Sequence, residues 1–152
     1  MSIFGALDIS ATGLTAERMR MDVTAENLAN AETTHGPNGQ PYRRREVVLG
    51  TAGEGGFGSA LASAVGSVPG APAEQPAGGV QVNGIVEDAS PPRMVYDPGH
   101  PDANAQGYVA MPNVNPVTEM VDLISASRAY EANVTAMQTS KAMFSKTFDL
   151  LR

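Results

Sequence analysis

The sequence contains no cysteine and no tryptophan, and aromatic residues make up only 5% of its 152 residues. Without cysteine the chain forms no disulfide and holds no metal through thiolates, so neither device stabilises its fold. The absence of cysteine leaves the redox compartment open. Few aromatic side chains also mean that the chain has little bulk with which to fill a core of its own.

Charged residues are also scarce, at 17% of the chain, and the formal net charge is −6. Nucleic acids and anionic membranes are bound through cationic patches that replace counterions, so we expect neither partner. No apolar run approaches the roughly 20 residues that span a membrane, and we expect no direct membrane insertion. The first residues, MSIFGALDIS, lack the basic start and apolar stretch of a cleaved signal peptide. Any export would therefore use another route.

The eleven prolines divide the chain into three parts, because all of them lie between Pro37 and Pro116. Proline removes a backbone donor and breaks helices, so the two ends are free to be helical and the middle is not. We therefore predict a mainly α fold with a small β portion. The predicted parts are an N-terminal helix in residues 1–35, a β or extended middle in 36–114 and a C-terminal helix in 115–152.

The N-terminal segment carries a heptad-like apolar stripe interrupted by one arginine. Its members alternate by three and four residues: Phe4, Leu7, Ala11, Leu14, Arg18, Met21, Ala25 and Leu28. The helix should stop near residues 30–41, where polar residues, Gly36 and Pro37 cannot continue it. A helix of about 28 residues is about 42 Å long.

The C-terminal segment has a strong start signal, with Asn115 as N-cap and Pro116 at the first helical position. Its stripe reads Met120, Leu123, Ser127, Tyr130, Val134, Met137, Lys141, Phe144, Phe148 and Leu151. A helix of roughly 36 residues is about 54 Å long, too long for so small a protein to cover. The two stripes thus predict a coiled-coil-like inner domain completed by further helical partners.

We assign the predicted subunit interface to these stripes and to three asparagines on the same helices. The residues are Leu7, Leu14, Met21, Asn27, Leu28, Asn30, Met120, Leu123, Tyr130, Asn133, Val134, Met137, Phe144, Phe148 and Leu151. Asparagine is a poor helix former, and amide side chains near a seam can fix the register of packed helices. Simple fraying or surface exposure of Asn27, Asn30 and Asn133 is the open alternative.

The middle reads as two strand regions separated by a low-complexity insert. Residues 42–51 form one strand, and residues 79–88 form a second strand or a short hairpin about Asn83-Gly84. The insert at 52–79 is rich in glycine and proline and is predicted to be flexible. The following residues are predicted to be an extended arm rather than a sheet, with a turn at Tyr96, Asp97, Pro98, Gly99, His100, Pro101 and Asp102.

Two patterns in the middle imitate ligand sites. Gly53, Gly55 and Gly58 fit G-x-G-x-x-G, but the segment is too short for the crossover helix and parallel sheet of a dinucleotide fold. Asp97, His100 and Asp102 are too few ligands for a closed metal shell, and turn formation explains them better. We expect no cofactor, no metal and no catalytic residues.

Arg43, Arg44 and Arg45 form the one basic run. A solvated strand face is one interpretation. The other is salt bridging to an acidic neighbour, which a second copy of this acidic chain would supply.

Three segments resemble the flagellar rod and hook axial proteins. Ser10–Gly36 carries the N-L-A-N-x-x-T core at Asn27, Leu28, Ala29, Asn30 and Thr33. The last helix is similar to the C-terminal signature of that family, with Glu119, Met120, Arg128, Ala129, Tyr130, Glu131 and Asn133 in place. Residues 95–116 resemble the segment characteristic of proximal rod proteins.

The resemblance implies a non-enzymatic structural subunit of the bacterial flagellar basal body that assembles by helix packing into the axial drive shaft. It implies unfolded export through the flagellar type III apparatus, a place in the periplasm-spanning rod, and terminal helices that are disordered in the free monomer. The implied partners are copies of the chain, neighbouring proximal and distal rod subunits, and the MS-ring or export-gate adaptor at the base.

Two other functions stay open from the residues alone. One is a small soluble helical adaptor or chaperone-like binding module that forms a closed dimer. The other is a dinucleotide-binding enzyme.

Overall fold

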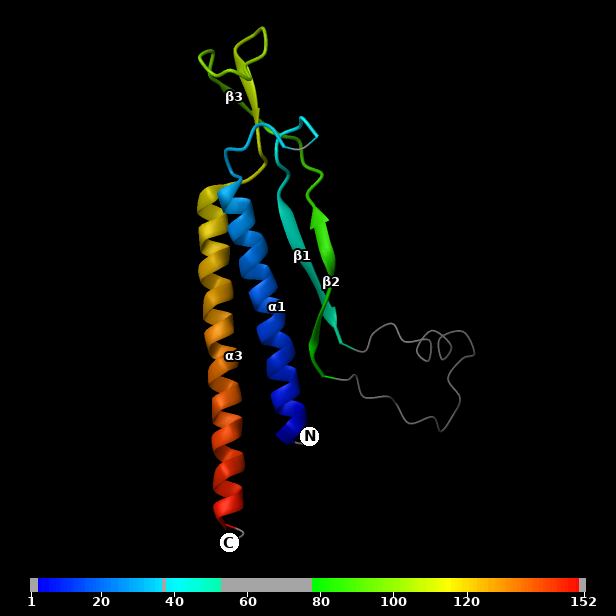
Figure 1. Cartoon of the computed structure of the whole chain (residues 1–152), viewed down its shortest axis with the longest axis vertical. Helices are drawn as coiled ribbons and strands as arrows, with labels where there is room; N and C mark the ends of the chain where they lie inside the picture. Colours follow the sequence, from blue (N-terminus) through cyan, green and yellow to red (C-terminus); the bar gives the residue numbers. More distant parts are fainter. Residues whose placement is uncertain (1–2, 37, 53–77, 151–152) are drawn as a thin grey trace, which may run out of the picture. The chain divides into compact units, whose positions relative to one another are not determined.

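The computed structural model describes residues 3–36, 38–52 and 78–150 (Figure 1). The elements in chain order are α1 (Ile3–Ala29), β1 (Arg45–Thr51), β2 (Val80–Glu87), β3 (Arg93–Tyr96), β4 (Tyr108–Met111) and α3 (Pro116–Leu150). Two long terminal helices and a small antiparallel β middle confirm the predicted mainly α fold. Most of the predicted flexible insert, including the glycine-rich motif, lies outside the described residues.

Both helices begin and end close to where the sequence places them. α1 has 27 residues and α3 has 35. Asn115 caps α3, because its Oδ1 accepts a hydrogen bond from the backbone N–H of Val117 at 3.1 Å. The N-cap prediction is confirmed.

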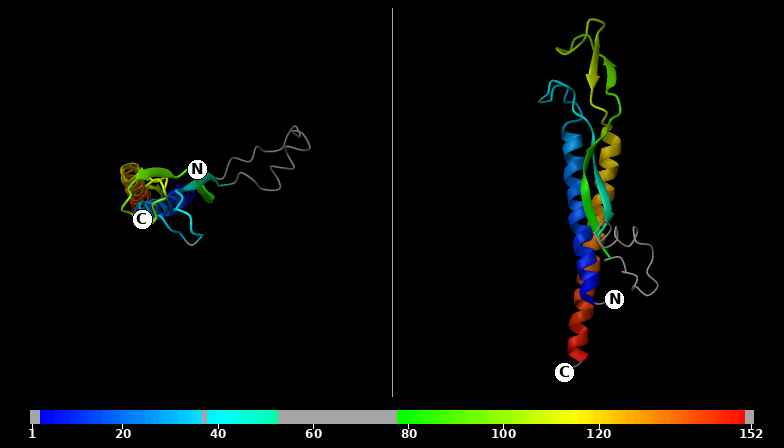
Figure 2. Two further views of the ribbon diagram at one scale, coloured as in Figure 1. Left: turned by 90° about the horizontal axis from the view of Figure 1, so that it is seen from above. Right: turned by 90° about the vertical axis from the view of Figure 1, so that its right-hand side faces the viewer.

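The chain divides into two compact units, and each long helix contributes to both. Unit 1 comprises Met1–Ala16, Leu49–Asn83 and Tyr130–Arg152, and unit 2 comprises Glu17–Val48 and Gly84–Ala129. Within each unit the segments of α1 and α3 lie side by side (Figure 1, Figure 2). The ends of the helices therefore do not mark where the compact units begin.

In unit 1 the two helices approach closely at a glycine. A Cβ atom placed on Gly13 would lie 3.0 Å from Asn133 Nδ2, so a methyl group here would require the Asn133 side chain to shift by a few tenths of an ångström. Ala16, about one turn further along α1, is buried. The Thr12 hydroxyl accepts a hydrogen bond from the backbone N–H of Val80 at 3.1 Å, which attaches the start of β2 to α1.

In unit 2 the buried apolar residues are small: Val23, Ala31, Val109, Val114 and Ala126. Small side chains allow backbones to approach closely but remove little apolar area from water. Unit 2 therefore depends on polar contacts to fix how its segments pack.

The strands form two separate two-stranded sheets, β1 with β2 and β3 with β4. β1 and β2 are antiparallel, since Ala52 donates to Gly79 at one end and Asp88 donates to Arg44 at the other. β2 is one continuous strand, so of the two alternatives for residues 79–88 the strand is correct and the hairpin is not.

The prediction of an extended arm rather than a sheet is wrong. β3 and β4 pair antiparallel from Arg93↔Met111 to Tyr96↔Tyr108. One face of this hairpin is buried at Val109, while the other exposes Met94, Tyr96 and Tyr108. The strands were missed because each has only four residues and a long proline- and glycine-rich loop separates them.

Candidate interface and polar cluster

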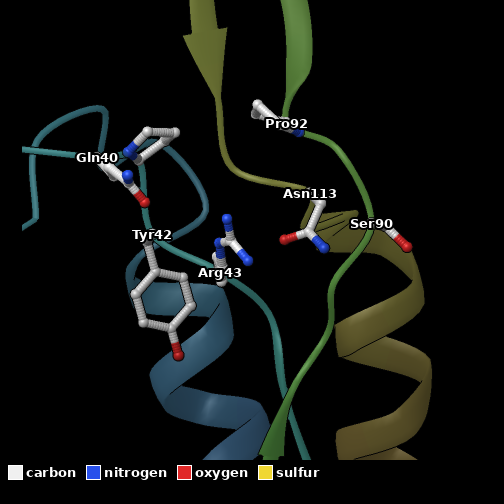
Figure 3. A pocket seen from close by; sticks show the side chains of 7 residues that line it. Gln40, Tyr42, Arg43, Ser90, Pro92 and Asn113 are labelled. Atoms are coloured by element: carbon white, nitrogen blue, oxygen red, sulfur yellow. The ribbon is translucent and has the colours of Figure 1, made fainter.

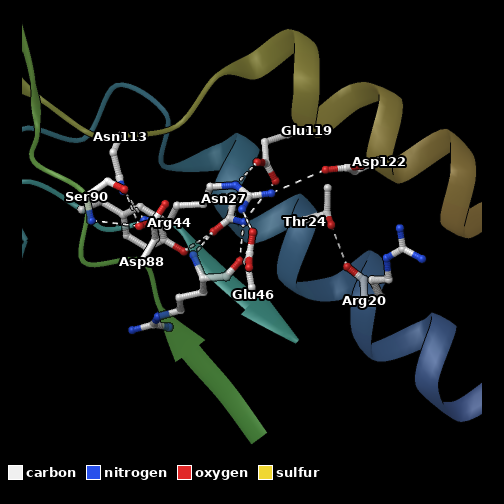
Figure 4. A network of polar contacts seen from close by, with 12 residues as sticks. Arg20, Thr24, Asn27, Arg44, Glu46, Asp88, Ser90, Asn113, Glu119 and Asp122 are labelled. Carbon is white, nitrogen blue, oxygen red and sulfur yellow. Dashed lines mark hydrogen bonds and ion pairs between the residues drawn. The ribbon is translucent and has the colours of Figure 1, made fainter. Parts of the chain in front are cut away.

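The most completely bonded side chain in unit 2 is Asn27, near the end of α1 (Figure 4). Its Nδ2 donates to the Arg45 carbonyl at 2.8 Å and to Glu119 Oε2 at 3.1 Å. Its Oδ1 accepts from the Tyr42 hydroxyl and from the Arg45 N–H, both at 2.9 Å. The side chain is 1% exposed, and all four of its hydrogen-bonding positions are used.

Glu119, in the first turn of α3, is the buried anion of this group. It is also 1% exposed, and its Oε1 accepts from Arg44 Nε at 2.5 Å. The Arg44 guanidinium also pairs with Glu46 and, at 3.5 Å, with Asp122. A buried carboxylate is tolerated only when it is paired and hydrogen-bonded, and here both oxygens have partners. We call Asn27, Tyr42, Arg44, Arg45 and Glu119 the polar cluster.

Two of the three consecutive arginines, Arg44 and Arg45, form ion pairs within the described structure, and Arg43 does not. Arg44 lies in the polar cluster, and Arg45 pairs with Glu26 at 2.8 Å and Glu87 at 3.5 Å. The Arg45 guanidinium also lies 5.7 Å from the centre of the Tyr42 ring. Arg43 is exposed and has no hydrogen-bond or ion-pair partner among the residues that the structure describes. A uniformly solvated strand face is therefore wrong for Arg44 and Arg45.

Burial of Tyr42 raises the pKa of its hydroxyl above the ordinary value of 10.0, and the nearby Glu26 carboxylate adds to this effect. The phenol therefore stays protonated at neutral pH and donates to Asn27. This is the protonation state that the polar cluster needs.

The three predicted asparagines differ in their surroundings. Asn27 connects α1 to α3, as the register interpretation requires. Asn133 lies against Gly13, which places an amide at the close approach of the helices in unit 1. Asn30 is half-buried and its side chain bonds locally, to the Glu26 carbonyl and the Thr33 hydroxyl.

Most of the other predicted interface residues lie along the two helices with intermediate exposure. The half-buried side chains are Leu7, Leu14, Met21, Leu28, Leu123, Tyr130, Val134, Met137 and Phe144. Met120 is exposed at 45%. The side chain of Phe148 and all of Leu151 lie outside the described part of the structure. Their assignment to a subunit interface stays a prediction.

A second apolar stripe on α3 faces solvent. Val117, Met120, Val121 and Ile124 are 45% to 65% exposed. Their spacing of three, four and seven places them on one helix face. We call these four residues the α3 stripe. An exposed apolar patch of this kind typically marks a surface that another protein covers.

Of the residues predicted to form a turn, Tyr96 ends β3 and residues 97–102 lie between β3 and β4. Asp97 Oδ1 accepts from the Gly99 N–H at 3.1 Å, and His100 Nδ1 accepts from the Asp102 N–H at 3.1 Å. Asp102 also accepts from the Thr34 hydroxyl at 2.7 Å. This bond, with the nearby His35 and His100, lowers the pKa of Asp102 below its ordinary value.

Within the described ranges, no group of three histidine, aspartate or glutamate side chains has the geometry to hold a metal ion. In the same ranges, no helix combines the length and apolar character that a membrane span requires.

Two family models match the ends of the chain. One, described as flagella basal body rod protein, matches residues 7–37. The other, described as flagellar basal body rod FlgEFG protein C-terminal, matches residues 105–150. The matched segments contain most of the two helices, the α3 stripe and two of the five residues of the polar cluster, Asn27 in the first segment and Glu119 in the second. The class of protein is therefore that of the flagellar basal-body rod.

Relatives that align over nearly the whole chain show which of the rod proteins this chain resembles. The chain is 49% identical to flagellar basal-body rod protein FlgC of Bacillus subtilis, with 99% of each chain covered. It is 43% identical to FlgC of Escherichia coli O157:H7 over 99% of this chain and 98% of that protein. It is 42% identical to FlgC of Borreliella burgdorferi over 100% and 99%. The chain belongs to the FlgC family.

Family membership establishes the chain as a non-enzymatic structural subunit of the flagellar basal-body rod, which assembles with other rod subunits. The adaptor and dinucleotide-enzyme alternatives are thereby set aside. The unfinished helix surfaces are the feature of this chain that suits such a role.

Proposed function

We propose that the chain builds the proximal part of the rod by burying the apolar surfaces of α1 and α3 against helices of neighbouring subunits. The observation that carries this proposal is the α3 stripe, four large apolar side chains on one helix face that the chain leaves 45% to 65% exposed. Burial of apolar area contributes about 25 cal/mol per Å² and is gained only when a neighbour is present. Assembly and completion of the fold are then one process.

In this proposal residues 1–35 and 115–152 form the inner, axial domain, and residues 36–114 form an outer part. The subunit interface is made by the residues assigned to the two helix stripes, together with the α3 stripe. In this proposal the surface that a subunit presents differs from the surface of the neighbour that packs against it. The contact is therefore head-to-tail and produces an open helical assembly rather than a closed ring.

The proposed neighbours are other copies, the adjoining proximal and distal rod subunits, and the MS-ring or export-gate adaptor at the base of the rod. The proposed route to this place is unfolded export through the flagellar type III apparatus into the periplasm, without a cleaved signal peptide. A strain with an inactive apparatus should then retain the subunit in the cytoplasm.

The test compares the double variant Val121→Ser/Ile124→Ser with Ser125→Ala on the same helix. The variant and wild-type subunits, carrying different tags, are expressed together, and their ratio is measured in purified basal bodies and in the exported pool. We expect the double variant to be exported normally and to be depleted from basal bodies by about tenfold or more. Ser125→Ala should incorporate like the wild type. Equal incorporation of the double variant would exclude the α3 stripe as an interface.

A further inference from the structure

Beside the polar cluster, unit 2 has a surface hollow of about 240 Å³ lined by Gln40, Pro41, Tyr42, Arg43, Ser90, Pro92 and Asn113 (Figure 3). The two proline rings and the tyrosine ring supply apolar walls. The chemistry of the hollow depends on which of its polar groups already have partners.

Asn113 contributes a buried donor without an acceptor. Its Oδ1 accepts from the backbone N–H of Arg44 at 2.9 Å. That bond fixes the orientation of the amide, because exchanging O and N would set two donors against each other. Its Nδ2 is buried and has no hydrogen-bond partner within the described structure. A buried donor without an acceptor is costly, and such groups are rare in folded proteins.

Arg43 contributes the second free donor and the positive charge. Arg44 and Arg45 are held by Glu119, Glu26 and other carboxylates, whereas Arg43 has no partner within the described ranges. Glu87 lines an adjoining hollow together with Arg43 and Arg45. Glu87 already pairs with Arg45 at 3.5 Å.

The remaining hydroxyls are occupied. The Ser90 hydroxyl donates to Asp88 Oδ1 at 2.6 Å, and the Tyr42 hydroxyl donates to Asn27. Besides the Gln40 amide, which can both donate and accept, the hollow is lined by these two donors, which together carry a single positive charge. A carboxylate matches this pair, since it accepts several hydrogen bonds and carries one negative charge.

We propose that this hollow receives an aspartate or glutamate side chain from a neighbouring copy of this chain in the rod. The chain has 16 acidic and 10 basic residues, so a second copy presents carboxylates in excess. A volume of about 240 Å³ is below the range of drug-sized ligand pockets and suits one inserted side chain. The inference rests on the proposed function, because the neighbour is present only in the assembled rod.

The first test uses Arg43→Gln, Arg43→Lys and Arg93→Gln in the tagged competition assay. Arg93 is an exposed arginine on β3 outside the lining of the hollow, so its replacement removes the same charge elsewhere. We expect Arg43→Gln to be depleted from basal bodies by about tenfold or more relative to wild type. Arg43→Lys keeps the charge but loses the forked geometry and should be depleted less. Arg93→Gln should incorporate normally.

Equal incorporation of Arg43→Gln and Arg93→Gln would overturn the proposal and leave solvent as the only occupant of the hollow. Depletion accompanied by a lower melting temperature of the free Arg43→Gln protein would also overturn it, because Arg43 would then stabilise the subunit itself. Absence of the wild-type subunit from basal bodies would instead contradict the proposed function.

The second test identifies the occupant. The natural chain has no cysteine, so Gln40→Cys provides one thiol at the hollow for a short photoreactive cross-linker. Irradiation of purified basal bodies should join two copies of this chain, at a peptide that contains aspartate or glutamate. Cross-links only to a different rod protein, or none between subunits, would overturn the assignment to a second copy.

Discussion

Asn27 on α1 donates a hydrogen bond from its Nδ2 to Glu119 Oε2 on α3, across 3.1 Å and 92 positions of sequence. Both side chains are 1% exposed. The bond fixes the N-terminal helix to the start of the C-terminal helix within unit 2. Because apolar contacts slide more easily than directed hydrogen bonds, this pair is suited to set helix register.

The first prediction concerns the two asparagines of the N-L-A-N core. Asn27→Ala leaves Glu119 and Tyr42 each short of one partner and the Arg45 backbone short of two. We therefore expect a loss of about 2–4 kcal/mol in the free energy of unfolding. Asn30→Ala removes only local bonds and should cost less than about 1 kcal/mol. Chemical denaturation of both purified variants measures the difference. Equal losses would mean that the polar cluster is unformed in the free subunit.

The second prediction concerns the ion pair between Arg44 and Glu119. Arg44→Met leaves a buried carboxylate without its cation and should cost about 3 kcal/mol. The double variant Arg44→Met/Glu119→Leu has no such charge, so its loss should be smaller than the sum of the single losses by at least about 1 kcal/mol. A double-mutant cycle in urea measures this coupling. Additive losses would show that the pair contributes no specific interaction.

Helix bounds could be predicted because their causes are local. Proline excludes helix from residues 37–114, and the Asn115-Pro116 start signal acts within one turn. Glu119 shows the limit of this reasoning, since its local sequence identifies it only as an acid near the positive end of the helix dipole. Its burial follows from contacts with α1 and the Arg44 segment, which no local pattern reveals.

Tertiary contacts also decide between chemically identical residues. Arg43, Arg44 and Arg45 are indistinguishable by type, yet only Arg43 lacks a partner in the described structure. The close approach of Gly13 and Asn133 likewise could not be predicted. A glycine within a helix indicates close packing only when the residue that faces it on the other helix is known. The fold class was therefore predictable, whereas the hollow was not.

The third prediction concerns pH. The Thr34 hydroxyl and the neighbouring His35 and His100 lower the pKa of Asp102 from its ordinary value of 3.8. A depressed folded-state pKa means that the stabilisation is present above the unfolded-state value and is lost as pH falls through the folded-state value. Thr34→Val should raise the pKa of Asp102 towards 3.8, observed by NMR titration of its carboxyl carbon.

Thr33→Val is the matched control for this titration, because the Thr33 hydroxyl donates to Asn30 rather than to Asp102. It should leave the pKa of Asp102 unchanged. If Thr34→Val and the wild type titrate together, the contact between residues 34 and 102 is absent in solution.

The fourth prediction concerns Tyr130 and Phe144 on the C-terminal stripe. Truncating a fully buried aromatic side chain costs about 3–5 kcal/mol. The chain leaves both rings only half-buried, so most of that cost should appear only when neighbouring subunits cover them. Tyr130→Ala and Phe144→Ala should therefore be exported and soluble, with melting temperatures close to wild type, yet fail to build rods.

Lys146→Ala serves as the control, because Lys146 is exposed on the same helix and its loss should affect neither the monomer nor assembly. Exported protein, monomer melting and rod formation are compared for the three variants. Normal rods from both aromatic variants would show that this stripe is not a subunit interface. Unfolded monomers would show instead that the two rings belong to the core of the single chain, since the cost would then be present before any neighbour arrives.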